Sequence, residues 1–165
     1  MSATWSLKYR LRCAQRGDAR AAEDIFHSAL SEHGFDGVSR DANSEISNFG
    51  LHKEPLRDDF VVVSGRKVCG FLILIPASDG CGEISKVFVA RAFRGQGIGT
   101  MLIEGAIQRA AERGYRELML ETNTAFHGAR RYYEGHGWTL VPYFETSATR
   151  TYSIRLVSAL KALRR

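Results

Sequence analysis

Six consecutive residues carry the clearest chemical signal in this sequence: Arg94, Gly95, Gln96, Gly97, Ile98 and Gly99. They lie between the apolar run 87–89 and a long pattern of apolar residues at helical spacing that begins near Thr100. Glycine allows the backbone to approach a ligand closely, and the first turn of a helix leaves N–H groups without partners. We therefore predict that this loop binds an anion such as a phosphate.

Two well-known phosphate-binding motifs do not fit these residues. A dinucleotide-binding G-x-G-x-x-G motif would need a third glycine where Thr100 stands. A Walker loop would need Gly-Lys followed by Ser or Thr, and this ending is absent. What remains is Arg-x-x-Gly-x-Gly, formed by Arg94, Gly97 and Gly99 between an expected strand and an expected helix.

This pattern resembles the acyl-CoA-binding motif of the GNAT acetyltransferase family, Gln/Arg-x-x-Gly-x-Gly/Ala. Farther along the chain, residues 129–138 read Ala-Arg-Arg-Tyr-Tyr-Glu-Gly-His-Gly-Trp. This segment is similar to the family's Ala-x-x-hydrophobic-Tyr-Glu-x-x-Gly-Phe/Trp segment, with Tyr133 at the tyrosine position. The resemblance is specific from about Gly82 to Trp138, and elsewhere it extends only to the order of the elements.

The resemblance implies acetyl-CoA as cosubstrate. Backbone amides from Gly95 to Thr100 would bind the pyrophosphate at the start of the helix. The pantetheine arm would run along the strand residues Val87, Phe88 and Val89, in a gap that opens between this strand and its parallel neighbour.

One position departs from the family pattern. Many relatives have an asparagine that contacts the pantetheine three residues before the alanine matched here by Ala129, and this chain has Phe126 there. Asn123, three residues earlier, is the candidate replacement.

Acetyl transfer to an amine needs one group that removes a proton from the amine and one that serves the departing thiolate. The resemblance makes Glu83 the first candidate for the base, because many relatives have a glutamate at this place, and Glu121 is the second. The resemblance implies that Tyr133 lies beside the sulfur as the candidate acid, and that the amide of Val87 or Val89 polarises the thioester carbonyl. Structural roles remain open: the glutamates could be solvated or accept structural hydrogen bonds, and Tyr133 could be a core aromatic.

The elements expected around these residues form one α/β domain over residues 1–165. Apolar and β-branched runs predict strands, and apolar residues at helical spacing predict helices. The expected strands are 9–12, 60–63, 68–75, 83–89, 117–121, 139–144 and 150–156. The main expected helices follow Asp18, span 98–113 and end near Glu134. We expect a single mixed, mostly antiparallel central sheet flanked by helices on both faces, with a parallel β-α-β core.

Composition narrows the functional classes. The chain has 165 residues, a net charge of +5 and three cysteines, with no Cys-x-x-Cys or His-Glu-x-x-His spacing. No apolar run approaches the roughly 20 residues of a membrane helix, and no dense basic stripe indicates nucleic-acid binding. We expect a soluble cytoplasmic protein with no metal, nucleic-acid or membrane partner. The C-terminal tail 157–165 is expected to form a short helix, to contact a second subunit in a homodimer, or to fray.

The main hypothesis is an N-acetyltransferase that moves an acetyl group from acetyl-CoA to a primary amine of a small molecule or peptide, by direct transfer in a ternary complex. Residues 20–60 contain nine acids and four bases, a local charge of −5, which suits a cationic acceptor. The alternative is a non-catalytic, acetyl-CoA-binding regulatory module.

Overall fold

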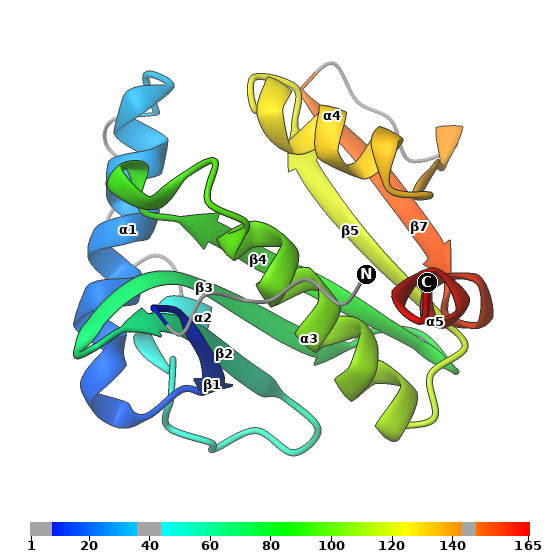
Figure 1. Ribbon diagram of the computed structural model, residues 1–165, viewed down its shortest axis with the longest axis horizontal. Helices are drawn as coiled ribbons and strands as arrows, with labels where there is room; N and C mark the ends of the chain where they lie inside the picture. Colours follow the sequence, from blue (N-terminus) through cyan, green and yellow to red (C-terminus); the bar gives the residue numbers. More distant parts are fainter. Residues whose placement is uncertain (1–7, 36–43, 143–147) are drawn as a thin grey trace.

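A mixed seven-stranded sheet forms the centre of the computed structural model, which describes residues 8–35, 44–142 and 148–165 (Figure 1). The strand order is β1-β2-β3-β4-β5-β7-β6. All neighbouring strands pair antiparallel except β4 and β5, which are parallel. The strands are β1 (Arg10–Cys13), β2 (Asp58–Ser64), β3 (Lys67–Pro76), β4 (Cys81–Val89), β5 (Glu117–Asn123), β6 (Thr139–Leu140) and β7 (Thr149–Arg155).

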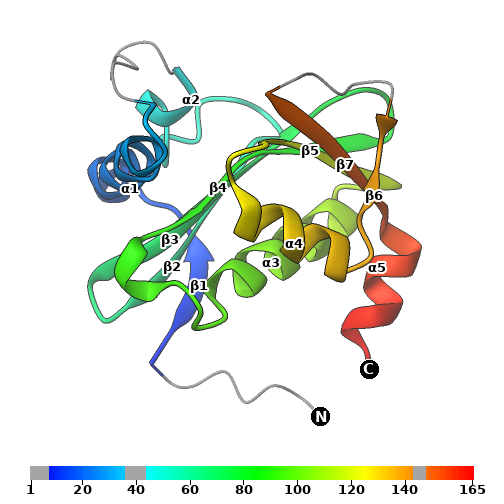
Figure 2. The same cartoon turned by 90° about the horizontal axis from the view of Figure 1, so that it is seen from above.

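Helices cover both faces of this sheet (Figure 2). One face packs against α1 and α2 around buried residues such as Phe26, Phe49 and Phe71. The other face packs against α3, α4 and α5 around Leu102, Tyr133 and Leu156. The helices are α1 (Ala19–Glu32), α2 (Ser44–Ser47), α3 (Ile98–Glu112), α4 (His127–Gly135) and α5 (Leu156–Leu163), with short 3-10 helices η1 (Arg16–Asp18) and η3 (Arg91–Phe93).

The two parallel strands pair over only part of their length. Cys81 to Ile84 of β4 lie beside Glu117 to Leu120 of β5, and the pairing ends there. Beyond this point the strands diverge, so that Figure 1 shows them as two arms of a V. A bulge at Ser85 marks the place, because Lys86 and Ile84 are paired with adjacent residues of β3 and Ser85 with neither.

The expected fold class is confirmed, and most expected elements differ from the observed ones by one to three residues at their ends. Asp18 does precede α1, but its carboxylate accepts hydrogen bonds from Arg12 and from the backbone N–H of Gln15, and does not cap the helix. The late strands pair as an antiparallel hairpin in which β6 ends at Leu140. The rest of the expected strand 139–144 includes residues outside the described ranges. Within the described ranges, no helix has the length and apolar character needed to cross a membrane.

A buried ionic network fixes α2 against the sheet. The Arg57 side chain, 4% exposed, donates to Asp59, which is 2% exposed, at 2.8 Å. Arg57 also donates to the backbone oxygen of Glu45 in α2, and Asp59 accepts the N–H of Gly50 at 2.8 Å. A third partner of Arg57, Glu54, is 51% exposed. Since the buried members satisfy one another, loss of one leaves the other charge buried without a partner.

Asp59→Ala should therefore lower the free energy of unfolding by about 3–5 kcal/mol, the usual cost of breaking a buried ion pair on one side. Glu54→Ala, which removes an exposed partner of the same guanidinium, should cost less than about 1 kcal/mol. Urea denaturation of both variants measures the difference. Equal losses of unfolding free energy in the two variants would show that the buried Arg57–Asp59 pair is not the main source of the network's stability.

Candidate functional site

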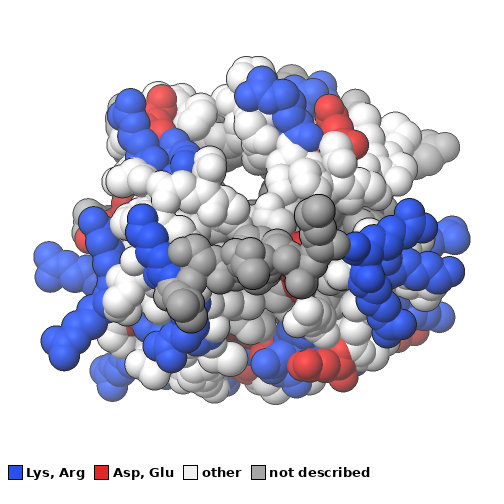
Figure 3. Space-filling view, viewed as in Figure 1, with Lys and Arg blue, Asp and Glu red and all other residues white. Residues whose placement is uncertain are grey.

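The gap between β4 and β5 contains a cavity of about 620 Å³. Its walls come from β4, the loop that follows it, the start of α3, the end of β5 and α4. Figure 3 shows the molecule hollowed out at this place, between the half that contains α1 and the half that contains α4. Side chains from both faces of the sheet therefore line the cavity, because the sheet is interrupted at this place.

The edge of β4 that faces the cavity has backbone groups without a strand partner. The N–H of Ala90 donates to Cys69 of β3 at 2.8 Å, so alternate residues direct their backbone groups toward β3. Val87 and Val89 then direct theirs toward the gap, where β5 no longer pairs. The oxygen of Val89 accepts a hydrogen bond from Arg94 Nε at 3.1 Å. The remaining groups can bind an extended, amide-containing ligand as a further strand would.

The glycine loop at the top of the gap has the conformation expected of an anion site. Gly95 has φ +72° and Gly97 has φ +83°, which side chains other than glycine rarely adopt. Gly97 is the N-cap of α3 and has no side-chain cap, and its oxygen accepts the N–H of Met101 at 3.0 Å. The N–H groups of residues 98–100 therefore lie ahead of the first helical hydrogen bond and are directed at the loop.

Arg94 does not point into this loop but joins it to α1. Its guanidinium donates to the two carboxylate oxygens of Glu32 at 2.6 and 3.2 Å. The hydrogen bond from Arg94 lowers the pKa of Glu32. The motif arginine therefore fixes the loop against α1 and the end of β4, and the backbone amides are left to contact an anion.

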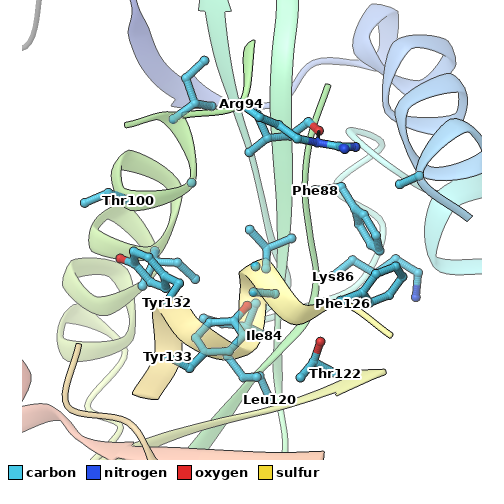
Figure 4. Close-up of a pocket in the computed structure, with 18 of the residues that line it drawn as sticks. Ile84, Lys86, Phe88, Arg94, Thr100, Leu120, Thr122, Phe126, Tyr132 and Tyr133 are labelled. Atoms are coloured by element: carbon cyan, nitrogen blue, oxygen red, sulfur yellow. Dashed lines mark hydrogen bonds between the residues drawn. The ribbon is translucent and has the colours of Figure 1, made fainter. Parts of the chain in front are cut away.

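Two adjacent tyrosines of α4 form the opposite wall. Tyr133 is 4% exposed and packs against Trp138 and Tyr152, with ring centroids 5.5 and 5.6 Å away. Its hydroxyl points into the cavity (Figure 4). Burial raises the pKa of Tyr133 far above its ordinary value, so the phenol stays protonated at neutral pH. Burial also raises the pKa of Tyr132, which hydrogen-bonds Thr100 and stacks on His136 at 4.0 Å.

The carboxylates of the site lie on the α1 side of the sheet. Glu83 is half-buried on β4, and burial raises its pKa, as do the negative charges of Glu45 and Glu121; Lys86 partly opposes this shift. Glu45 Oε2 accepts from Ser85 Oγ at 2.8 Å and from Lys86 Nζ at 2.7 Å. Burial alone would raise the pKa of Glu45, but these two hydrogen bonds outweigh it and lower the pKa.

The structure brings most of the predicted site residues to this cavity. Glu83 and Gln96 are the exceptions: Glu83 lies near the cavity but does not line it, and Gln96 is hydrogen-bonded to Tyr9 and to the oxygen of Ala92. Their expected roles, like those of the other residues, stay predictions. The predicted residues that line the cavity are Val87, Phe88, Val89, Arg94, Gly95, Gly97, Ile98, Gly99, Thr100, Glu121, Asn123 and Tyr133.

Asn123 and Phe126, the two residues considered for the position of the family asparagine, have different surroundings. Asn123 lines the cavity, and its side-chain oxygen accepts the N–H of Ala125 at 2.9 Å, which leaves its NH₂ group available to a ligand. The ring of Phe126 instead reaches across the gap to His33, the residue that follows α1, at 4.6 Å between centroids, and to Phe88 at 6.1 Å. Phe126 therefore forms part of the wall on the α1 side.

Several lining residues were not predicted from the sequence. Lys86, His33, Tyr132 and Thr122 line the cavity, and Glu45 supports it through Lys86. Glu45 and Lys86 are 41 positions apart, and no local pattern links them. Within the described ranges there is no group of three or more His, Cys, Asp or Glu residues placed to hold a metal ion.

The sequence and the fold are similar to those of known proteins. A sequence model of the acetyltransferase (GNAT) family matches residues 22–138. Rat (Rattus norvegicus) N-acetyltransferase 8F1 is 32% identical over 84 residues, 48% of this chain, which spans only 38% of that protein. A Staphylococcus aureus GNAT acetyltransferase has the same fold: its TM-score is 0.78 at 18% identity, with 90% of this chain and 99% of that one covered. A Bacillus anthracis structure in complex with acetyl coenzyme A has a TM-score of 0.56 at 21% identity, covering 62% and 64%.

Gly97→Ala should weaken acetyl-CoA binding by about tenfold or more, which corresponds to 1.4 kcal/mol, because a Cβ at φ +83° would force the loop to shift its amides. Gly114→Ala is the matched control, since Gly114 follows the other end of α3 at φ +79°. It should cost similar stability and leave binding unchanged. Calorimetric titration measures both affinities, and equal weakening would argue against the loop as the phosphate site.

Proposed function

This chain belongs to the GNAT acetyltransferase family, whose members use acetyl-CoA, and from that premise we propose that it transfers the acetyl group directly to a primary amine of a small molecule or peptide. The observation that supports the proposal most is the single cavity that joins three features: the glycine loop, the unpaired edge of β4 and the Tyr133 hydroxyl. None of Cys13, Cys69 and Cys81 lines this cavity, which favours direct transfer over an acyl-cysteine intermediate.

The proposed donor lies along the cavity from the loop to α4. N–H groups of residues 98–100 and of the glycine loop bind the pyrophosphate. The amides of the pantetheine arm pair with Val87 and Val89, and the NH₂ group of Asn123 donates to the arm from β5. One amide of the β4 edge then polarises the thioester carbonyl as negative charge develops on its oxygen.

The acceptor nitrogen attacks the carbonyl carbon after it has lost a proton. A primary alkyl ammonium with a pKa of about 10.4 is mostly charged at neutral pH, so a base that accepts its proton lowers the barrier. Glu83 is paired with Met119, one residue before β4 and β5 separate, and its raised pKa makes it a stronger base than an exposed glutamate. Because Glu83 does not line the cavity, the proton reaches it through water.

The C–S bond then breaks and the electron pair remains on the sulfur of CoA. Tyr133 donates its O–H to this sulfur, since its hydroxyl points into the cavity. The raised pKa of Tyr133 makes complete proton transfer to a thiolate unfavourable, because an ordinary thiol has a pKa of about 8.5. Tyr133 therefore acts as a hydrogen-bond donor that stabilises the leaving group, and the released thiolate takes its proton from solvent.

The experiment that tests this function follows thiol release from acetyl-CoA in the presence of a panel of primary amines, with calorimetric titration of acetyl-CoA in parallel. Turnover of any amine supports the transferase. Micromolar binding of acetyl-CoA without turnover across the panel would favour the regulatory module, and absence of binding would overturn the assignment of the donor.

Tyr133→Phe should lower kcat by about 10²–10³-fold, the usual loss when one hydrogen-bond donor to a developing anion is removed. The affinity for acetyl-CoA should change by less than about threefold, because the ring and its packing are retained. Tyr132→Phe, the adjacent tyrosine whose hydroxyl bonds Thr100, is the control and should retain most of kcat. Steady-state kinetics would refute the role of Tyr133 if both variants lost the same activity.

The pH profile of kcat/KM should have an acid limb above the ordinary glutamate range, because Glu83 acts as a base only when deprotonated and its pKa is raised. Glu45→Gln removes a negative charge that contributes to this shift, so the limb should move to lower pH. Glu83→Gln should abolish the limb and lower kcat by about 10²–10⁴-fold. A limb that persists in Glu83→Gln would exclude Glu83 as the titrating base.

A further inference from the structure

The acceptor must approach from the α1 side of the sheet if the donor is bound as proposed above. Val87 and Val89 pack with the core on the α3 and α4 side, where the donor lies, whereas Lys86 and Phe88 point to the opposite side (Figure 4). The same cavity is lined on that opposite side by Ala29 of α1, by His33 just after α1, and by Phe126. These residues therefore surround the part of the cavity that the donor leaves open.

The α1 side of the cavity carries a net negative charge, and this charge does not come mainly from the acid-rich segment 20–60. Most acids of the segment 20–60 that the structure describes are used in ion pairs: Glu32 with Arg94, Glu45 with Lys86, and Asp58 and Asp59 with arginines. Within the described ranges, Glu83 and Glu121 have no cation at ion-pair distance. The three glutamates 45, 83 and 121 together with Lys86 carry a net charge of −2 at neutral pH.

Among the described residues that line the cavity, no Lys or Arg is free to bind a carboxylate. Lys86 and Arg94 are the two Lys or Arg residues among the described residues that line the cavity. Each is held by a glutamate, at 2.7 and 2.6 Å respectively. A carboxylate beside the reacting amine would thus be repelled by Glu121, which lines the cavity, and by the nearby Glu83, whose charge Lys86 opposes only in part.

Three aromatic rings, His33, Phe88 and Phe126, line the cavity on this side. Phe126 contacts His33 at 4.6 Å, Phe88 at 6.1 Å and Phe35 at 6.3 Å between ring centroids, in edge-to-face arrangements. The Phe35 residue is 36% exposed. An aromatic group on the acceptor can therefore pack beside Phe126 while its amine lies near the carboxylates.

We propose that the acceptor is a cationic primary amine that carries an aromatic group within a few bonds of the nitrogen and has no carboxylate on the carbon that bears it. This inference rests on the proposed acetyltransferase function. An arylalkylamine and the N-terminus of a peptide that begins with an aromatic residue share this chemistry, and a free amino acid lacks it. Glu121 contributes the charge selectivity, and Phe126 contributes the preference for a ring.

The test compares kcat/KM for phenethylamine, phenylalanine, phenylalaninamide and propylamine with the full chain and saturating acetyl-CoA. Phenethylamine should exceed phenylalanine by at least tenfold, although its more basic nitrogen is less often neutral. It should also exceed propylamine by at least tenfold. Phenylalaninamide represents the N-terminus of a peptide. A higher kcat/KM for phenylalaninamide than for phenethylamine would indicate a peptide acceptor, and the reverse would indicate a small arylalkylamine.

Two variants assign the preferences to residues. Glu121→Gln should reduce the phenethylamine-to-phenylalanine ratio by at least threefold, and Phe126→Leu should reduce the phenethylamine-to-propylamine ratio by a similar factor. Both should bind acetyl-CoA as the unchanged protein does, which a misfolded variant would not. Equal use of phenylalanine and phenethylamine by an active enzyme would overturn the charge selectivity alone. Acetyl-CoA binding without turnover of any amine would instead refute the proposed function, and the inference with it.

Discussion

The rest of this site depends on one constraint, the end of pairing between β4 and β5 after Ile84 and Leu120. A parallel pair that continued would use the backbone groups of Val87 and Val89 in its own ladder and would leave no cavity. An exposed edge of this kind would favour aggregation, since unpaired strand edges can pair with strands of other chains. Here the edge lines a cavity whose opposite walls are α3 and α4, so a ligand arm can enter where a foreign strand cannot.

The bulge at Ser85 determines which side chains face each half of this cavity. Because side chains alternate along a strand, one extra residue reverses the side of every residue after it. The insertion places Val87 and Val89 toward α3 and α4, and Lys86 and Phe88 toward α1. Without the insertion, Val87 and Val89 would face α1, and Lys86 and Phe88 would face α3 and α4. The proposed separation of donor and acceptor therefore depends on the one residue of β4 that has no partner in β3.

Much of the donor half of the site could be predicted from sequence because its determinants are local. Gly95 and Gly97 are needed for their positive φ angles, and the helix that follows has an apolar pattern of its own. The role predicted for Tyr133 rests on its position in the contiguous segment 129–138. The half proposed for the acceptor could not be predicted, since it depends on contacts between distant segments: Glu45 reaches Lys86 across 41 positions, and Phe126 reaches His33 at the end of α1. Neither the bulge nor the extent of pairing leaves a pattern in the sequence.

Arg94, the arginine of the motif, contacts α1 and the end of β4, and its side chain does not point into the glycine loop. Arg94 holds α1 through Glu32 and the β4 edge through the oxygen of Val89, while the glycine amides remain directed at the anion. Backbone amides are fixed by the fold, so they bind a phosphate without the entropy loss that ordering a long side chain would require. Arg94 therefore links α1 to the glycine loop along one side of the cavity. A change in α1 would reach this loop through one ion pair, so in the proposed arrangement Glu32 supports the donor site although it lies on the side proposed for the acceptor.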